Sequence, residues 1–488
     1  MQHVHIEFQR VQTWLFSVPR LRAMVGANSI FGETLRVELP KLARQQDAPW
    51  KLRSLRSYTD YPTADPQDPL ACHDDPALDA RDGILSRDGG HFEAHFEKGA
   101  QAFAETAKQL IQERLPGLRF CIIIDGKELQ KSQAHLSTEL PVLAPCEWTG
   151  HGLASALIKQ GDEHSAVSLN VERMHQAAKR SESGKASDLA SLLIEATQLK
   201  SLQRPQDLNQ LAGKGYLALI QADGNGVGKA SRKYNSDIDR VSFFHRNRVL
   251  LRRALKKTID SYSPTQGQAP LVPLMLGGDD LLLVCRAEIA LPFVVKLCEE
   301  LEQIQPSTSD FKLTLGVGVV IAKPTIPIYR LHEVLEQLVS SAKRRFRSLV
   351  KISARSVVDW AVYTTAWADD PSEFRHREWL CGTDQQLRVL SQRPLDVLGT
   401  GLDTLQGLLA SAAKLRNAPR SQLRYLVEQL FRGCTLSELA FKELSAQARS
   451  ALEQAGVGAP WRTSQCGSAL LTEVLDLVEV LEIPRLGT

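Results

Sequence analysis

Two adjacent aspartates, Asp279 and Asp280, follow a pair of glycines and stand between apolar runs at 271–276 and 281–285. A tight hairpin between two hydrophobic strands would hold both carboxylates at the edge of a sheet, and Mg²⁺ prefers such oxygen ligands. Gly277 and Gly278 lack side chains and would let a nucleotide approach the backbone. The pattern indicates a nucleotidyl-transferring enzyme, while a polar hairpin tip with two solvated acids remains open from these four residues alone.

A third acid follows a separate apolar run. Residues 216–220 are strand-like in length, and the run ends at Asp223, followed by Gly224, Asn225 and, four residues later, Lys229. The turn after the strand would supply backbone N–H groups that can face phosphate. Three acids at two strand ends could share two metal ions about 3.5–4 Å apart, which would activate a ribose 3′-hydroxyl and stabilise departing pyrophosphate. This arrangement favours the enzymatic interpretation over surface acids.

Length and composition set the frame for this site. A chain of 488 residues that is 43% hydrophobic and 24% charged is typical of a soluble globular protein with about two to four domains. The net charge of +3 is too small for a global basic field, so nucleic acid would be bound through local patches. Neither a membrane-spanning apolar run nor a signal peptide is recognisable, which predicts a cytoplasmic protein.

Cysteine spacing argues against a structural metal. The eight cysteines occur singly, without any Cys-x-x-Cys pair, so neither a disulfide framework nor an ordinary zinc knuckle is expected. Cys146 with His151 could hold a metal only if distant residues completed the ligand set. Zinc is therefore not expected as a cofactor.

The chain contains an internal βαββαβ repeat, which predicts an α/β (α+β) fold with two ferredoxin-like domains. In the first copy, His91 and Phe92 stand where Asp279 and Asp280 stand in the second, so the first copy is predicted to be catalytically silent. The predicted first copy consists of a strand at 3–8, a helix at 30–43, a hairpin at 84–96, a helix at 99–114 and a strand at 120–124. The predicted second copy consists of a strand at 216–222, a helix at 237–260, a hairpin at 271–285, a helix at 291–304 and a strand at 311–321.

The remaining segments complete a prediction of four domains. A turn at 150–152, a strand at 167–171 and a helix at 187–199 are expected between the copies, and 57–88 is expected to be a partly disordered surface excursion. The tail is expected to be helical, with candidates at 387–390, 402–415, 421–431, 436–455 and 470–481. The predicted domains are a degenerate first palm (1–143), a mixed linker domain (144–212), a catalytic second palm (213–374) and a helical C-terminal domain (375–488).

These motifs resemble a known family, the large polymerase-cyclase (palm) subunit of type III CRISPR effector complexes. The resemblance spans most of the chain. It rests on the opening Val11-Gln12-Thr13-Trp14-Leu15-Phe16, the degenerate Gly89-Gly90 hairpin, Asp223-Gly224-Asn225-x-x-Gly228, the Gly277-Gly278-Asp279-Asp280 hairpin, Leu315-Gly316-Val317-Gly318-Val319 and Ser341-Ala342-Lys343.

The resemblance implies synthesis of cyclic oligoadenylate second messengers from ATP, with Mg²⁺ or Mn²⁺, in antiviral defence triggered by target RNA. It implies other CRISPR effector subunits, guide RNA and target RNA as partners, and no membrane. Asp223 and Asp279 would bind metal, and Asp280 would bind the second metal or activate the hydroxyl. The nucleotide-binding residues would be Gly277, Gly278, Gly224, Asn225, Lys229 and Lys343. Arg344, Arg345 and Arg347, beside Lys343, could instead make this stretch a solvated helix face or an RNA-phosphate contact.

Three departures from the family pattern modify this expectation. The first palm begins almost at once, so the family's amino-terminal HD nuclease domain is missing and DNA cleavage is not expected. The zinc-binding insertion has left only Cys146. Asn225 replaces the second Asp of a common Asp-Gly-Asp pattern, so weaker metal binding or dependence on Mn²⁺ is expected.

Two other functions remain open. A non-catalytic scaffold subunit that binds RNA and proteins would keep the fold, but Asp223, Asp279 and Asp280 speak against it. A diguanylate or mononucleotide cyclase would share the palm and its hairpin. The Asp-Asp pair in place of Asp-Glu, the silent first palm and the helical tail favour the oligoadenylate interpretation.

Overall fold

The computed structural model describes residues 2–55, 57–131, 144–160, 163–182, 184, 187–306, 310–349, 354–364, 370–383, 386–464 and 469–486. Two compact units form, one from Met1–Leu208 with Gly226–Leu283 and the other from Asn209–Asn225 with Val284–Thr488. The predicted boundary after residue 143 lies outside the described residues. Within the described ranges, no helix is both long and apolar enough to cross a membrane.

The first palm has the predicted strand order. Strands β1 (Gln2–Gln9), β3 (Ile84–Ser86), β4 (His91–Lys98) and β5 (Arg119–Ile124) run β3-β4-β1-β5, all antiparallel, with α5 (Ala100–Arg114) before β5. This is the order that a βαββαβ repeat produces. Short strands β2 (Lys51–Leu52) and β6 (Lys127–Lys131) extend its two edges. The predicted helix at 30–43 begins earlier, as α2 (Leu21–Glu33), and continues through a π-helical turn into α3 (Leu39–Ala43).

The prediction that 57–88 is a partly disordered surface excursion is wrong. The segment contains α4 (Pro76–Arg81) and buries Asp68 and Asp74. Both carboxylates bind α10 (Asp237–Tyr262), where Arg252 lies 2.9 Å from Asp68 and 2.6 Å from Asp74. A bidentate pair joins Arg248 to the same Asp74. The aspartates of this segment suggested an exposed loop, but Asp68 and Asp74 attach the segment to α10.

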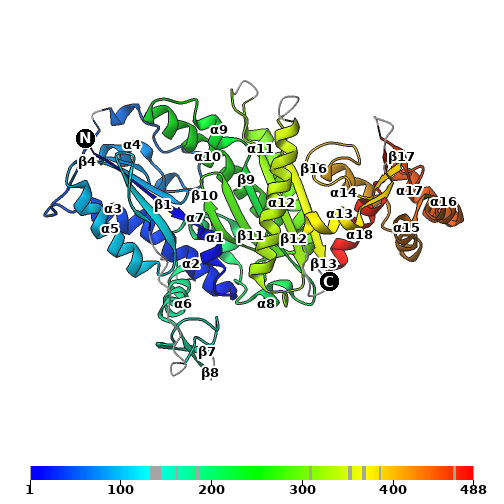
Figure 1. The fold of residues 1–488 in the computed structure, drawn as a ribbon, viewed down its shortest axis with the longest axis horizontal. Helices are drawn as coiled ribbons and strands as arrows, with labels where there is room; N and C mark the ends of the chain where they lie inside the picture. Colours follow the sequence, from blue (N-terminus) through cyan, green and yellow to red (C-terminus); the bar gives the residue numbers. More distant parts are fainter. Residues whose placement is uncertain are drawn as a thin grey trace. The chain divides into compact units, whose positions relative to one another are not determined.

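The second palm repeats the first. Its sheet has the order β10-β11-β9-β12, formed by β9 (Leu217–Gly224), β10 (Leu271–Gly277), β11 (Asp280–Arg286) and β12 (Leu315–Ala322). β13 (Val357–Tyr363), parallel to β12, and β16 (Leu395–Asp396) widen it. Helices α11 (Ala287–Ile304) and α12 (Ile328–Leu349) both contact β9 and β12, and every residue of β12 is buried (Figure 1).

The linker differs from its prediction. A hairpin of β7 (Ala156–Gln160) and β8 (Glu163–Val167) ends where the strand at 167–171 was expected to begin, and α6 (Leu169–Glu182) follows. In α6, buried residues recur at helical spacing in an otherwise polar sequence, and the helix contacts α2. Gly26 permits this contact, because a Cβ there would lie 1.7 Å from the carbonyl oxygen of Met174. The predicted helix at 187–199 is the shorter α7 (Leu189–Glu195), and α8 (Leu208–Ala212) follows in the linker.

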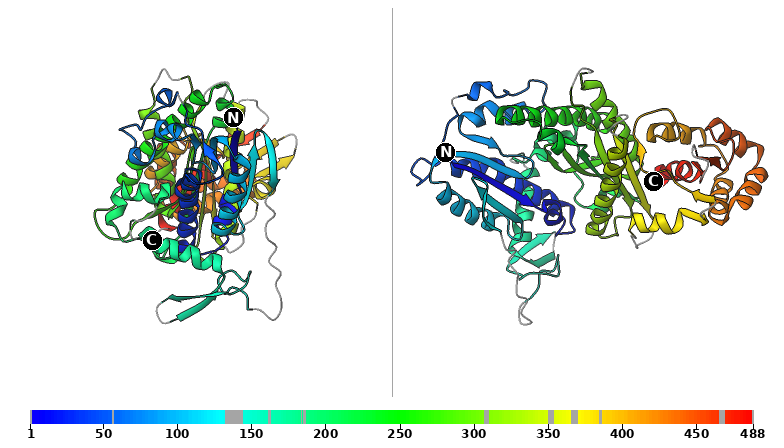
Figure 2. Two further views of the ribbon diagram at one scale, coloured as in Figure 1. Left: turned by 90° about the vertical axis from the view of Figure 1, so that its left-hand side faces the viewer. Right: turned by 45° about the horizontal axis from the view of Figure 1, so that its top comes forward.

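The C-terminal region is helical but not wholly so (Figure 2). Residues 387–390, predicted as a helix, lie largely in strand β15 (Gln386–Val389), part of a four-stranded sheet with β14 (Leu380–Thr383), β17 (Arg462–Thr463) and β18 (Ala469–Leu471). The predicted helix at 436–455 is two helices, because Ser445 caps the second of them through the N–H of Ala448. The helices are α13 (Pro371–Glu378), α14 (Leu405–Lys414), α15 (Arg420–Arg432), α16 (Cys434–Glu443), α17 (Ala446–Gln454) and α18 (Val474–Leu486).

Candidate functional site

Three carboxylates meet at the ends of two neighbouring strands. Asp223 is the next-to-last residue of β9, Asp280 opens β11, and Asp279 lies in the turn before it. One carboxylate oxygen from each lies within 4.8 Å of the others, and all three side chains are half-buried. Like charges this close repel one another unless a cation is shared among them. The chemistry of the donor set, three hard oxygen ligands, fits Mg²⁺ or Mn²⁺.

Lys343 of α12 approaches the same cluster. Its Nζ donates to Oδ2 of Asp223, and the two side chains are 24% and 28% exposed. Sequence reasoning assigned Lys343 to the triphosphate, and the structure places its ammonium at a predicted metal ligand instead. Both side chains remain partly exposed, so this ion pair is not a buried one.

Two glycines of β12 explain why Lys343 can reach so far. Gly316 is the cross-strand partner of Asp223. A Cβ on Gly316 would lie 2.9 Å from both Lys343 Cγ and Asn225 Oδ1, and a Cβ on Gly318 would lie 2.9 Å from the carbonyl oxygen of Leu335. Side chains at these positions would push α12 away from the sheet. Sequence reasoning read Gly316 and Gly318 only as a family motif, although alternate glycines in a strand are a general signal of close backbone approach.

The hairpin that carries the acids meets its counterpart in the first palm. Gly278 has φ +37°, a left-handed backbone that favours glycine. A Cβ built on Gly277 would lie 3.7 Å from Cα of Gly89, so the two Gly-Gly turns lie close together. The duplicated hairpins therefore approach each other at their tips, one with acids and one with His91.

The residues after Asp223 occupy different environments. Asn225 is 2% exposed; its side-chain nitrogen lies 3.2 Å from Oγ1 of Thr314, and its backbone N–H donates to the Thr314 carbonyl. Gly224 is buried, and Lys229 is exposed on the short α9 (Val227–Ser231). The nucleotide-binding roles of Gly224, Asn225 and Lys229 stay predictions.

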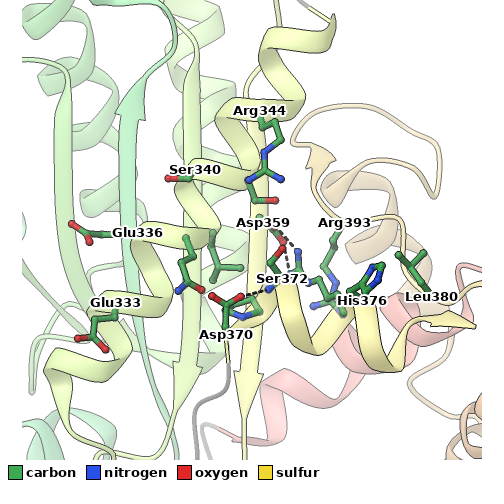
Figure 3. Close-up of a pocket in the computed structure, with 15 residues that line it drawn as sticks. Glu333, Glu336, Ser340, Arg344, Asp359, Asp370, Ser372, His376, Leu380 and Arg393 are labelled. Carbon is green, nitrogen blue, oxygen red and sulfur yellow. Dashed lines mark hydrogen bonds and ion pairs between the residues drawn. The ribbon is translucent and has the colours of Figure 1, made fainter.

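The basic residues beside Lys343, predicted as one cluster, make different contacts. Arg345 lies 3.6 Å from Asp396, and Arg344 lines a pocket of about 790 Å³ between α12, β13 and α13 (Figure 3). At the base of this pocket Asp359 and Arg375 form a bidentate pair with both N–O distances at 2.7 Å. Neither Lys343 nor Asp223 lines the pocket. Lys343 and Arg344 therefore lie on different surfaces of helix α12.

Comparison with known proteins finds a match to the part of the chain that contains the three acids and Lys343. Residues 216–349 match the sequence profile of the second palm domain of Cas10/Cmr2. This segment is therefore similar to a Cas10/Cmr2 palm domain. The matched range begins just before β9, ends with α12, and includes all three acids and Lys343. No curated protein matches the sequence.

Solved structures with similarity to the chain are cassettes of two proteins, Csm1 and Csm4. The cassette in complex with cA4 shares 12% identity, with a TM-score of 0.45 over 99% of this chain and 69% of that chain. The cassette in complex with one ATP has the same identity and a TM-score of 0.43 over 100% and 70%. The Csm1–Csm4 subcomplex of the type III-A CRISPR-Csm interference complex also gives 12% and 0.43, over 100% and 69%.

Proposed function

We propose that this protein is a nucleotidyltransferase that makes cyclic oligoadenylates from ATP in type III CRISPR antiviral defence. The observation that carries the proposal is the convergence of Asp223, Asp279 and Asp280 within a Cas10-type palm. Asp279 and Asp280 belong to the Gly-Gly-Asp-Asp hairpin, and Asp223 ends the neighbouring strand. A scaffold subunit would have no use for three carboxylates held against their mutual repulsion.

The reaction would join one nucleotide to the next. The 3′-oxygen of one ATP forms a bond to the α-phosphorus of another, the bond from that phosphorus to the pyrophosphate oxygen breaks, and pyrophosphate leaves. Asp223, Asp279 and Asp280 would hold Mg²⁺ or Mn²⁺, which when bound lowers the pKa of the attacking hydroxyl and offsets the charge on pyrophosphate. Asp280 would in addition accept the hydroxyl proton. Gly277 and Gly278 would leave room for the nucleotide beside the backbone.

Lys343 would exchange partners during this reaction. Its Nζ pairs with Asp223 in the structure, and a triphosphate beside the same carboxylates would offer it a more highly charged acceptor. The flexible side chain of a lysine can move between two acceptors on one helix face. We propose that Lys343 releases Asp223 and binds the triphosphate when ATP enters.

The first palm would hold the acceptor nucleotide. The Gly89-Gly90 and Gly277-Gly278 turns lie close together, which supports a silent hairpin facing the acidic one, as in a dimer of palms within a single chain. The acceptor's 3′-hydroxyl would then face the donor bound by the acids. His91→Ala, a change confined to the first hairpin, should reduce cyclisation; unchanged cyclisation would count against this role.

The partners of this activity would be other CRISPR effector subunits, guide RNA and target RNA, with target RNA as the trigger. The test incubates the purified full chain with ATP or GTP and Mg²⁺ or Mn²⁺, with and without co-purifying RNA and subunits, and identifies products by mass spectrometry. Cyclic adenylates that vanish in Asp279→Ala/Asp280→Ala would support the proposal. Cyclic di-GMP would instead indicate a diguanylate cyclase, and silence of the reconstituted complex would favour a scaffold.

A further inference from the structure

One arginine holds the base of the Gly89-Gly90 turn in the silent hairpin. Arg36 lies in the π-helical turn η1 (Thr34–Glu38), and its Nη1 donates to Oδ1 of Asp88, directly before the glycine pair. Its Nη2 donates to the His73 carbonyl over 2.6 Å. Arg87 Nη1 in turn donates to the carbonyl oxygen of Arg36 over 3.1 Å. Both residues that precede the glycine pair are therefore bound to Arg36.

The ion pair of Arg36 and Asp88 is closed to solvent. The two side chains are 5% and 9% exposed. Burial alone would raise the pKa of Asp88, but the attraction of Arg36 lowers it, so the carboxylate stays charged. Removal of one partner from such a pair is strongly destabilising, whereas replacement of both by apolar residues often is not. The stability of the fold therefore does not by itself require charges at this position.

The acidic hairpin of the second palm is held differently. When the two glycine pairs are aligned, Met275 and Leu276 stand where the silent hairpin has Arg87 and Asp88. Leu276 is 6% exposed and belongs to the apolar core. An apolar side chain directly before the glycines is thus compatible with this hairpin. Of the two hairpins, the one with the ion pair is the one that would hold the acceptor nucleotide.

The turn that Arg36 holds lies next to the acidic hairpin. A Cβ on Gly277 would lie 3.7 Å from Cα of Gly89. The segments that contain Arg36, Gly89 and Gly277 belong to one compact unit. Beyond the glycines, His91 Nε2 lies 3.0 Å from Oγ of Ser86, so the turn is also tied across its own hairpin. A shift of this turn would change the separation of the two hairpins.

We propose that Arg36 is a positioning residue for the acceptor nucleotide. The proposal rests on the function proposed above, in which the first palm holds the acceptor and the three acids hold the metal ions. Arg36 would act through Asp88, which sets the place of the Gly89-Gly90 turn beside Gly277. A misplacement of about 1 Å can cost about a hundredfold in rate. Loss of the ion pair should therefore impair use of the acceptor and leave the metal site intact.

The test separates the acceptor from the donor. The diadenylate ApA has a 3′-hydroxyl and no triphosphate, so it can only accept a nucleotide from ATP. Arg36→Met/Asp88→Leu removes the ion pair without leaving one buried charge unpaired. In the full-length protein with its co-purifying RNA and subunits, this change should raise KM for ApA about tenfold or more. KM for ATP at saturating ApA, and Mn²⁺ affinity measured by calorimetry, should not change.

Two further variants make the result specific. Arg36→Lys keeps the charge but lacks the planar fork of donors, so its KM for ApA should fall between those of the unchanged protein and the double variant. Arg44→Met is the matched control, because Arg44 is a 40% exposed arginine of the same palm that pairs with Asp82 at 2.9 Å. This control should alter neither KM.

Circular dichroism shows whether each variant folds, and if the double variant does not, Arg36→Lys decides. An unchanged KM for ApA in the folded variant would overturn the inference, as would an equal loss in the use of ApA and ATP. Silence of the unchanged protein in its reconstituted complex would overturn the proposed function, and the inference with it.

Discussion

Lys343 and Asp223 form an ion pair across the face of the second palm, between α12 and the end of β9. The same carboxylate is one of three that fit a divalent cation. An ammonium and a metal ion would compete for one oxygen, so in the proposed reaction the pair would link nucleotide binding to metal binding. The first prediction follows from this competition.

Lys343→Met should strengthen binding of Mg²⁺ or Mn²⁺ in the absence of nucleotide, because a competing positive charge is removed. The same change should lower kcat/KM for ATP by roughly ten- to a hundredfold, because a charge-assisted contact to the triphosphate is worth about 1.5–3 kcal/mol. Metal titration by calorimetry and product assays measure the two effects. Arg330→Met, at an exposed position on the same helix, is the matched control; equal losses in both variants would contradict the role of Lys343.

Gly316→Ala should impair the site with a modest loss of stability. The added methyl group would lie 2.9 Å from Asn225 Oδ1 and from Lys343 Cγ, so α12 or the turn after β9 must shift. We expect activity to fall at least tenfold and unfolding free energy to fall by about 1–3 kcal/mol, the usual cost of overpacking. Gly458→Ala, which meets nothing within 4 Å, should be neutral in both measurements. A fully active Gly316→Ala variant would show that α12 can move away from β12 without loss of activity.

Arg252→Met should weaken the packing of segment 57–88 against α10. Arg252 is 1% exposed and is bound by both Asp68 and Asp74, so its removal leaves two buried carboxylates short of positive charge. Breaking a buried pair on one side costs about 3–5 kcal/mol. Amide hydrogen exchange should rise first in 57–88 and in α10. Arg246→Met, on an exposed face of α10, should leave exchange unchanged, and the prediction fails if both variants exchange alike.

His332 should make the second unit sensitive to mild acid. Burial in α12 lowers the pKa of His332 to about 4, although Glu336 Oε1 lies 3.7 Å from its Nε2. The unfolded histidine has a pKa near 6.5, so the unfolded chain binds the extra proton and stability falls as pH drops from about 6.5 towards 4. At about 1.4 kcal/mol per pKa unit, the loss reaches roughly 3 kcal/mol.

Thermal melting between pH 7 and pH 4 tests this, with His332→Leu as the comparison. The variant should lose less stability on acidification than the unchanged protein. Parallel pH profiles would show that other groups govern the acid response.

Much of the palm architecture could be predicted from the sequence because strands and helices follow one another in the same order in both copies. Apolar runs of strand length, the glycine pairs and the helix lengths between them predict two βαββαβ units, and the strand orders confirm them. The same logic brought Asp223 near Asp279, since the first and third strands of such a unit are neighbours. The three acids were therefore predictable as a group.

The errors occurred where tertiary contacts override local pattern. Residues 57–88 look like a polar loop, and only the distant arginines at 248 and 252 make that loop ordered. Residues 387–390 are a short, mainly apolar run that contains Arg388, and pairing of 387–389 with β18 rather than any local period makes them a strand. The ion pair of Lys343 depends on how closely α12 approaches β12. The alternate glycines of β12 indicate this close approach, whereas a search of the sequence for acidic residues does not reveal it.

The close approach of Gly89 and Gly277 brings together two hairpins of a single chain. In a pair of separate palms, that encounter would be bimolecular and would weaken on dilution. Within one chain the tethered halves have a high effective concentration, so the facing hairpins persist at any protein concentration. Joining two hairpins in one chain also allows them to differ, so one carries Asp279 and Asp280 and the other His91 and Phe92, which two identical copies could not do.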